Sequence, residues 1–239
     1  MALVGVLDGD AVSVVTTGAC GRFASRNAAN NATVTVSGLT IRGAQAMDYN
    51  LIATTTANIT PRPISISVAA VSDTKVYDGT TSASAPTITI TSGSFAFGDV
   101  AAFTESFDTK NVGTGKTLTV TGFINDGNSG NNYALTLTLA PASVTTGVIT
   151  PLAITVTASD DIKYYDGTTS ASALPVVTGG SLAEGDTSAF TESFDTKNAG
   201  IDNKTLTVAG SVNDGNSGNN YAVTFVTITG GRLFRSRSR

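Results

Sequence analysis

Internal repetition is the feature of this sequence that most constrains its fold. Residues 102–111, AFTESFDTKN, recur unchanged at 189–198, an offset of 87 residues from 102 to 189. A second block, NDGNSGNNYA, runs over 125–134 and recurs at 213–222, an offset of 88 residues from 125 to 213. Blocks that keep their order and nearly constant spacing indicate one structural unit that has been duplicated.

A third pair of motifs extends the duplication, and the N-terminal stretch adds a degenerate copy. KVYDGTTSAS begins at Lys75 and KYYDGTTSAS begins at Lys163. In the first copy TVTVSGL begins at Thr33, where the second copy has TLTVTGF, but this copy has no YDG motif. Ile-Thr-Pro closes the first copy at Pro61 and the second at Pro151, and a proline fixes an extended joint there.

These boundaries give the expected domain organisation. We expect a truncated repeat at 1–61, complete repeats at 62–150 and 151–231, and a disordered basic tail at 232–239. The sequence around the tail, GRLFRSRSR at 231–239, differs abruptly from the preceding composition, so we interpret the tail as a fragment or expression scar in preference to a phosphate-binding arm.

Period-two alternation of apolar and polar residues predicts that each repeat is built from strands. Ile64, Ile66 and Val68 alternate with serines, and no window keeps a helical period. We therefore expect all-β, tandem antiparallel modules of ~85–90 residues, each an immunoglobulin-like sandwich with its own core. The apolar phase of the later strands predicts buried side chains at Leu118, Val120, Leu135, Leu137, Leu206, Val208 and Val223.

Composition excludes several classes of function. The chain has no histidine and no tryptophan, and Cys20 is the only cysteine, so neither a disulfide nor a thiolate metal site can form within it. The formal net charge of −4 falls to about −8 without the four arginines of 232–239, and acidic modules do not attract nucleic acid. No stretch approaches the ~18 to 20 apolar residues of a membrane span, and the first residues, MALVGVLDGDAV, lack the basic region and the sustained apolar run that a signal peptide is expected to have.

The motifs, taken together, resemble the YDG-type repeats, relatives of the MBG repeats, of large secreted bacterial adhesins of the filamentous haemagglutinin and two-partner-secretion kind. The resemblance rests on the ordered motifs K-x-Y-D-G-T-T, Gly-Asp, K-N-x-G, T-x-T-V-x-G, N-Y and I-T-P. It implies a β-grasp-like alternative to the sandwich, and a secreted or cell-surface protein whose signal is expected outside this fragment. The proline-marked joints, with almost no linker, independently lead us to expect modules arranged end to end.

The YDG motif has two interpretations, a ligand site or a structural turn. Its residues are Tyr77, Asp78 and Gly79 in one repeat and Tyr165, Asp166 and Gly167 in the other. Aspartate bonds its own backbone and glycine accepts a positive φ, so we favour the turn, with the tyrosine ring covering the edge of the core.

Carboxylates offer little for catalysis but leave calcium open. Glu105 and Asp108 are three residues apart on one strand and so point to opposite faces, which rules out a shared acid-base role. Without histidine no hydroxyl nucleophile has an ordinary base, so we expect no enzyme and no cofactor. Asp160 and Asp161 provide hard oxygen ligands near the second boundary and are the candidate calcium residues.

Two classes of function remain open at this point. The first is a monomeric, non-catalytic shaft or spacer whose partners are the neighbouring repeats of the same chain. The alternative is a repeated surface that directly binds a host or cell-surface glycan or protein, ice, or another cell, possibly with calcium. We rank the spacer first because few aromatic residues are available for sugar binding.

Overall fold

The computed structural model describes residues 5–235 and confirms the all-β fold class. The first repeat contains β1 (Ser13–Val15), β2 (Cys20–Phe23), β3 (Ala29–Ser37), β4 (Thr40–Arg42), one 3-10 turn η1 (Ala46–Asp48) and β5 (Thr54–Ile59). The second contains β6 (Arg62–Ala69), β7 (Thr74–Val76), β8 (Thr87–Ser92), β9 (Val100–Phe107), β10 (Gly113–Asn125), β11 (Tyr133–Leu139) and β12 (Ser143–Thr150). The third contains β13 (Leu152–Thr157), β14 (Ile162–Tyr164), β15 (Val176–Gly179), β16 (Thr187–Phe194), β17 (Gly200–Asn213), β18 (Tyr221–Val226) and β19 (Ile228–Phe234).

The chain forms two compact units, and their boundary passes through the second repeat. Unit 1 comprises residues 1–67, 88–103 and 122–138, and unit 2 comprises 68–87, 104–121 and 139–239. Unit 1 therefore joins the first repeat to one part of the second, and unit 2 joins the other part of the second repeat to the third. A junction between consecutive repeats lies inside each unit.

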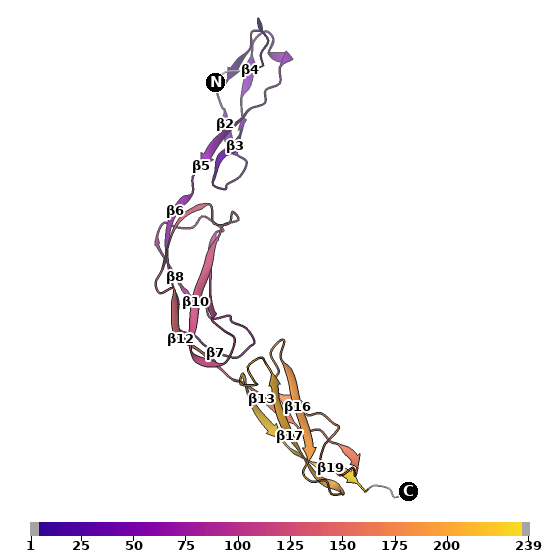
Figure 1. Cartoon of the computed structure of the whole chain (residues 1–239). Coiled ribbons are helices and arrows are strands. Elements are labelled where there is room, and N and C mark those ends of the chain that lie inside the picture. The colour runs from indigo at the N-terminus through magenta and orange to yellow at the C-terminus, as the bar shows by residue number, and fades with distance from the viewer. Residues whose placement is uncertain (1–4, 236–239) are drawn as a thin grey trace. The chain divides into compact units, whose positions relative to one another are not determined.

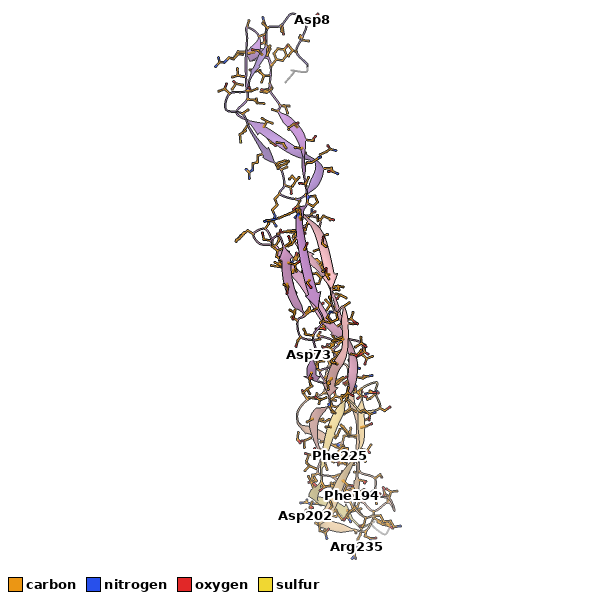
Figure 2. The ribbon with its side chains drawn as sticks, turned by 90° about the vertical axis from the view of Figure 1, so that its left-hand side faces the viewer. Asp8, Asp73, Phe194, Asp202, Phe225 and Arg235 are labelled. Carbon is orange, nitrogen blue, oxygen red and sulfur yellow. The ribbon has the colours of Figure 1, made fainter. Side chains whose placement is uncertain are left out.

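The third repeat, which lies entirely in unit 2, shows the topology most completely (Figure 1). Its four-stranded sheet has the order β14-β19-β17-β16, and its three-stranded sheet has the order β15-β13-β18. The strands β16 and β17 pair antiparallel over eight residue pairs, from Thr187 with Asn213 to Phe194 with Leu206. Leu206 and Phe194 are both buried, which places the core on this face of the sheet; Phe194 is labelled in Figure 2.

The sheets also contain parallel pairs, which the expectation of antiparallel modules did not include, because both sheets of the third repeat are mixed. The strand β13, which opens the repeat, pairs parallel with β18 over six residue pairs, and β14 pairs parallel with β19. Side chains alternate in the same way in parallel and antiparallel strands, so the sequence periodicity cannot distinguish the two. The long chain segment between β13 and β18 provides the crossover that a parallel pair requires.

The expectation of a separate core in each complete repeat is wrong. One hydrophobic cluster in unit 2 contains Tyr77 and Ile149 of the second repeat together with Ile154, Val156 and other core residues of the third. Only Pro151 separates β12 from β13, so the two buried strands follow one another without a linker. The cluster therefore runs across the boundary.

The burial predictions hold for some strands and fail for one. Leu118, Val120, Leu206 and Val208 are buried, and Val223 is partly buried against the cluster. Leu135 and Leu137, in contrast, keep 36% and 39% of their surface exposed. Both lie on β11, which is an edge strand of the sheet β11-β6-β8 and has a hydrogen-bonded neighbour on one side only.

The predicted start of the basic tail, residue 232, is wrong, because β19 continues to Phe234. Arg232, Leu233 and Phe234 belong to β19 and pair in parallel with Ile162, Lys163 and Tyr164 of β14. Leu233 is fully buried, like Ile149 of the preceding repeat, and both residues belong to the hydrophobic cluster of unit 2. GRLF thus completes the third repeat in the place of GVIT, and residues 236–239 of the predicted tail lie outside the described residues.

Glycine in the T-x-T-V-x-G motif is required by the approach of a neighbouring strand. A side chain at Gly122 would place its Cβ 2.4 Å from the carbonyl oxygen of Ala102 and 2.5 Å from the Cα of Phe103. Any larger residue would push β10 away from β9 at this point.

Candidate functional site: the junction between repeats

The K-N-x motif of one repeat docks onto the N-Y motif of the next. In unit 2 the backbone N–H of Val112 donates to Oδ1 of Asn220 at 2.9 Å. The side-chain amide of Asn220 donates in turn to Oδ1 of Asn111 at 3.2 Å. Asn220 is fully buried, so both hydrogen bonds are shielded from water. The loop before β10 and the start of β18 are thereby joined across the repeat boundary.

A single carboxylate, that of Asp186, collects donors from both repeats. Tyr221 of the same repeat and Tyr77 of the preceding repeat donate their hydroxyls to Oδ2 of Asp186, at 2.7 Å and 2.9 Å. The ammonium of Lys110 lies 3.5 Å from Oδ1 and balances the charge of this buried group. A buried carboxylate that is paired and hydrogen-bonded in this way avoids the cost of an isolated charge.

The two tyrosines remain protonated and pack against each other. Burial and the hydrogen bond to Asp186 raise the pKa of Tyr221 above its usual range, and they outweigh the opposing N–H of Ala183. Burial likewise raises the pKa of Tyr77. The rings of Tyr77 and Tyr221 meet edge to face, with centroids 5.5 Å apart at an interplanar angle of 72°. Contact of this kind adds about 0.5–1.5 kcal/mol to the burial of the rings.

The rest of the YDG motif shapes the turn that carries Tyr77 into the junction. Asp78 accepts hydrogen bonds from the N–H of Thr80 at 2.8 Å and from the ammonium of Lys75 at 2.8 Å, which makes an Asx turn closed by an ion pair. Gly79 has φ of +80°, and a Cβ there would lie 3.1 Å from the Cβ of Ala183 in the next repeat. Glycine is therefore needed for both the conformation and the close approach.

The YDG turn of the third repeat has the same internal geometry. Asp166 accepts from the N–H of Thr168 at 2.9 Å and pairs with Lys163 at 2.9 Å, and Gly167 has φ of +83°. Lys163 and the donors of Thr168 lower the pKa of Asp166 to about 2. Tyr165, however, is 42% exposed, whereas Tyr77 is 1% exposed.

The NDGNSGNN loop holds the docking asparagine in position. Oδ1 of Asp214 accepts from the N–H groups of Asn216 and Gly218 at 2.7 Å and 2.8 Å, and Oδ2 accepts from the N–H of Asn220 at 3.0 Å. Burial acts to raise the pKa of Asp214, but these three donors outweigh it and the pKa is lowered. Asn216 also donates to Oδ1 of Asn220 at 2.9 Å, which orients the carboxamide.

The same arrangement recurs in unit 1, between the first and second repeats. The N–H of Ala28 donates to Oδ1 of Asn132 at 2.7 Å, and Asn132 donates to Oδ1 of Asn27 at 3.3 Å. Arg26 replaces the lysine and lies 2.7 Å from Oδ1 of Asp99. Tyr133 donates to Oδ2 of the same carboxylate at 2.9 Å. The two junctions differ in sequence, but equivalent backbone N–H, asparagine, aspartate and tyrosine groups make the same hydrogen bonds in both.

The unit 1 junction also lacks the tyrosine of the YDG motif, because the described part of the first repeat has no such motif. A cavity of about 220 Å³ lies beside Ala96, Asp99 and Tyr133. The equivalent residues in the third repeat are Ala183, Asp186 and Tyr221, which contact the YDG turn of the second repeat. The cavity therefore marks the place that Tyr77 fills at the other junction.

The candidate calcium residues are placed differently from each other. Asp160 is exposed, whereas Asp161 is buried and accepts from the N–H groups of Ile162 and Ser172 at 2.8 Å and 2.6 Å. These donors outweigh the effect of burial and lower the pKa of Asp161. Asp73 (Figure 2) makes the equivalent bonds to Ser84 in the second repeat. Within residues 5–235 no three acidic, histidine or cysteine side chains gather into a metal-binding group.

The predicted separation of Glu105 and Asp108 is visible in their partners. Glu105 is buried and accepts from the N–H of Val71 at 3.0 Å, and burial raises its pKa. Asp108 is at the surface and lies 3.3 Å from the ammonium of Lys116. Each carboxylate has a structural partner of its own.

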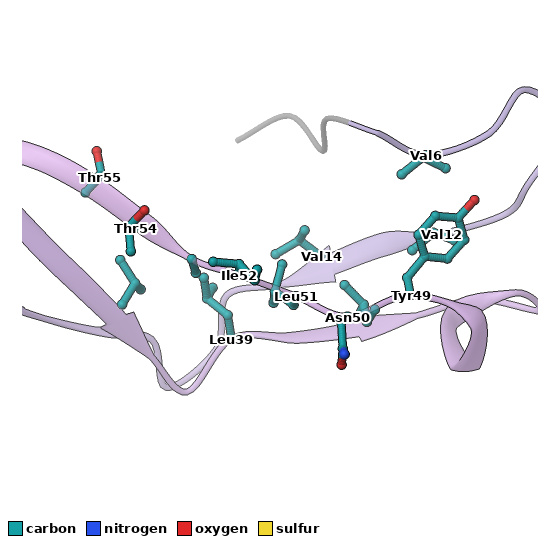
Figure 3. Close-up of a pocket in the computed structure, with 13 residues that line it drawn as sticks. Val6, Val12, Val14, Leu39, Tyr49, Asn50, Leu51, Ile52, Thr54 and Thr55 are labelled. Carbon is teal, nitrogen blue, oxygen red and sulfur yellow. The ribbon is translucent and has the colours of Figure 1, made fainter.

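A larger apolar groove, of about 590 Å³, opens in the first repeat (Figure 3). Val14, Val36, Leu39 and Leu51 are among the residues that line it. In the third repeat the strand β13 pairs with β18, and its residues Ile154 and Val156 lie in one buried cluster with Val208, the counterpart of Val36. The described part of the first repeat has no strand equivalent to β13, which leaves this side of its core open.

The residues that make the junction were missed as a site by sequence reasoning. In the sequence, DGNSGNN stands out only as part of a repeated block, and K-N-x-G only as one of the family motifs. Their exact recurrence within one chain was the available signal, because surface turns that contact nothing have no reason to keep identical side chains.

Fold and junction together define a tandem-repeat protein whose all-β modules are joined by a recurrent polar contact. The YDG domain model matches residues 1–57, 60–143 and 150–230, and the chain belongs to the YDG domain family. Neither a curated protein nor a solved structure matches it. In the part of the chain that the structure describes, no helix is long and apolar enough to cross a membrane.

Proposed function

We propose that this chain is a non-catalytic structural segment, the shaft or spacer of a secreted or cell-surface bacterial adhesin-like protein. The observation that carries the proposal is the recurrent junction. The pairs Ala28–Asn132 and Val112–Asn220 make the same N–H to Oδ1 hydrogen bond at two successive repeat boundaries. A contact that is rebuilt at every boundary maintains the spacing of the repeats, which is what a spacer requires.

The contacts of four aspartates support a structural role. Asp186 and Asp99 bind the preceding repeat, while Asp126 and Asp214 hold the loops that present the docking asparagines. These carboxylates stabilise the fold and the junctions through hydrogen bonds that are already satisfied. The adhesin and secretion parts of the proposal rest on the sequence resemblance described above.

Small-angle X-ray scattering on the whole chain tests the spacer. A compact globule of 239 residues has a radius of gyration of about 18 Å. We expect a clearly larger value, unchanged over a concentration series, because end-to-end repeats extend the particle. A radius of gyration near that of the globule would show side-by-side packing and contradict the spacer.

A second candidate function, direct binding by the repeats, is favoured by one observation. Ile88, Ile90, Leu135 and Leu137 on the edge strands β8 and β11 are between 36% and 43% exposed. Exposed apolar residues gathered on one sheet are typical of contact surfaces for a glycan or a protein. Glycan-array binding that is lost in a Leu135→Ser, Leu137→Ser variant of unchanged melting temperature would support this candidate over the spacer.

A further inference from the structure

The third repeat carries a second set of the residues that dock the second repeat onto the third. By the internal repeat, Tyr165 corresponds to Tyr77, Lys197 to Lys110, and Asn198-Ala199 to Asn111-Val112. We call these four residues of the third repeat, Tyr165, Lys197, Asn198 and Ala199, the donor end. All four are exposed.

The groups of the donor end that correspond to the docking groups of the second repeat have no partner within residues 5–235. The Tyr165 hydroxyl, the Lys197 ammonium and the Ala199 N–H make no hydrogen bond there, although each of their counterparts makes one or an ion pair. The contrast in exposure is largest at the tyrosine, 42% for Tyr165 against 1% for Tyr77. The third repeat therefore carries an exposed tyrosine, an unpaired lysine and a free backbone N–H at the sequence positions whose counterparts make the contact in the second repeat.

The two segments that bear the donor end, the YDG turn and the K-N-x loop, make the same internal contacts as their docked counterparts. Lys204 pairs with Asp195 at 2.8 Å, as Lys116 pairs with Asp108 at 3.3 Å, and both pairs brace the loop that bears the K-N-x motif. The Asx turn at Asp166 matches that at Asp78. Little conformational entropy remains to be lost when such a surface binds.

We propose that the donor end docks onto the acceptor end of a further YDG repeat. Such an acceptor presents a buried aspartate beside a tyrosine hydroxyl, and an asparagine whose Oδ1 accepts while its amide donates. This proposal rests on the proposed function and names the partner of one of its surfaces. Lys197 pairs with the aspartate, the Tyr165 hydroxyl donates to it, and the Ala199 N–H donates to the asparagine.

The chemistry selects a repeat of the complete type. Both complete acceptor ends in this chain, around Asp99 and Asp186, already hold a donor. The first repeat keeps the aspartate and the tyrosine, since Tyr49 donates to Oδ2 of Asp10 at 2.6 Å, but it has Asp48 where the others have asparagine. A carboxylate cannot donate to Asn198, so the first repeat of a second copy is a poorer partner.

The test is a chain that carries a second copy of residues 151–234 directly after Phe234, measured by amide hydrogen exchange. We expect the Ala199 amide to exchange at least about tenfold more slowly than in the parent chain, because it gains the acceptor that Val112 has. Lys197→Glu, an exposed change that leaves the fold intact, should remove this protection by placing two carboxylates together. Thr224→Glu, also exposed, is the matched control and should leave the protection unchanged.

The Val112 amide is the internal reference that separates the two proposals. A protected Val112 with an unprotected Ala199 in the extended chain would overturn the docking proposal and leave the spacer standing. Fast exchange at both the Val112 and the Ala199 amide would contradict the junction itself and therefore the spacer. Protection of Ala199 that survives Lys197→Glu would overturn the assigned contact with the aspartate.

Discussion

Tyr77 and Asp186 stand 109 residues apart in sequence, in different repeats, and the hydroxyl of the first donates to Oδ2 of the second at 2.9 Å. The same oxygen accepts from Tyr221 at 2.7 Å. One carboxylate therefore couples the YDG turn of one repeat to the N-Y motif of the next. The motif that gives the family its name acts across a boundary in this chain.

Tyr77→Phe should lower the free energy of unfolding by about 1–2 kcal/mol, because the hydroxyl is buried and donates to a charged acceptor. Tyr165→Phe is the matched control, since the same residue in the third repeat is exposed and unpaired, and its effect should stay within about 0.5 kcal/mol. Urea unfolding followed by circular dichroism measures both. Equal effects of the two changes would mean that the hydrogen bond to Asp186 adds nothing to stability.

Lowering the pH should destabilise the junction through the aspartates that accept backbone N–H groups. The pKa of Asp214 is lowered in the folded chain, so the unfolded chain binds its proton first as the pH falls below about 3.9. The Asp214 carboxylate therefore contributes its full stabilisation above the pKa of the unfolded chain. This contribution is lost as the pH falls toward the lower pKa that Asp214 has in the folded chain. Asp214→Asn should reduce the slope of stability against pH in this window, as measured by urea midpoints at several pH values.

Glu192 and Glu105 act in the opposite direction and serve as the control. Burial raises the pKa of each in the folded chain, so the folded state binds the proton first as the pH falls toward about 4.3. Protonation of Glu192 should therefore stabilise the folded chain as the pH falls, at higher pH than the range in which Asp214 is protonated. Glu192→Gln should remove this gain in stability. An identical change of slope in both variants would show that these carboxylates are not the groups that titrate.

Calcium removal should leave the melting temperature unchanged, since the oxygens of Asp161 already accept bonds from Ile162 and Ser172. Thermal scans in excess calcium and in excess EGTA measure this directly. A rise in melting temperature with calcium that disappears in an Asp160→Asn, Asp161→Asn variant would instead establish a metal site there.

Sequence patterns predicted the parts of this fold that depend on local chemistry. Alternation identified the strands, and the Asp-Gly pairs are tight turns because both requirements, a short acceptor and a positive φ, are set by neighbouring residues. The parallel pairing of β13 with β18 was not predictable, since alternation carries no strand direction. The contact between Tyr77 and Asp186 depends on how two repeats meet, and hydrophobic periodicity contains no information on that.

Leu118→Ala and Leu135→Ala should separate the buried core of the second repeat from its exposed edge. The two leucines lie on β10 and β11 in the same alternating phase, yet Leu118 is fully buried and Leu135 is 36% exposed. Removing the buried side chain leaves a cavity, so Leu118→Ala should cost about 2–5 kcal/mol. Leu135→Ala loses only partial burial and should cost about 1 kcal/mol or less. Urea unfolding of the two variants decides the matter, because losses of similar size would place β11 in the core and contradict its assignment as an uncovered edge strand.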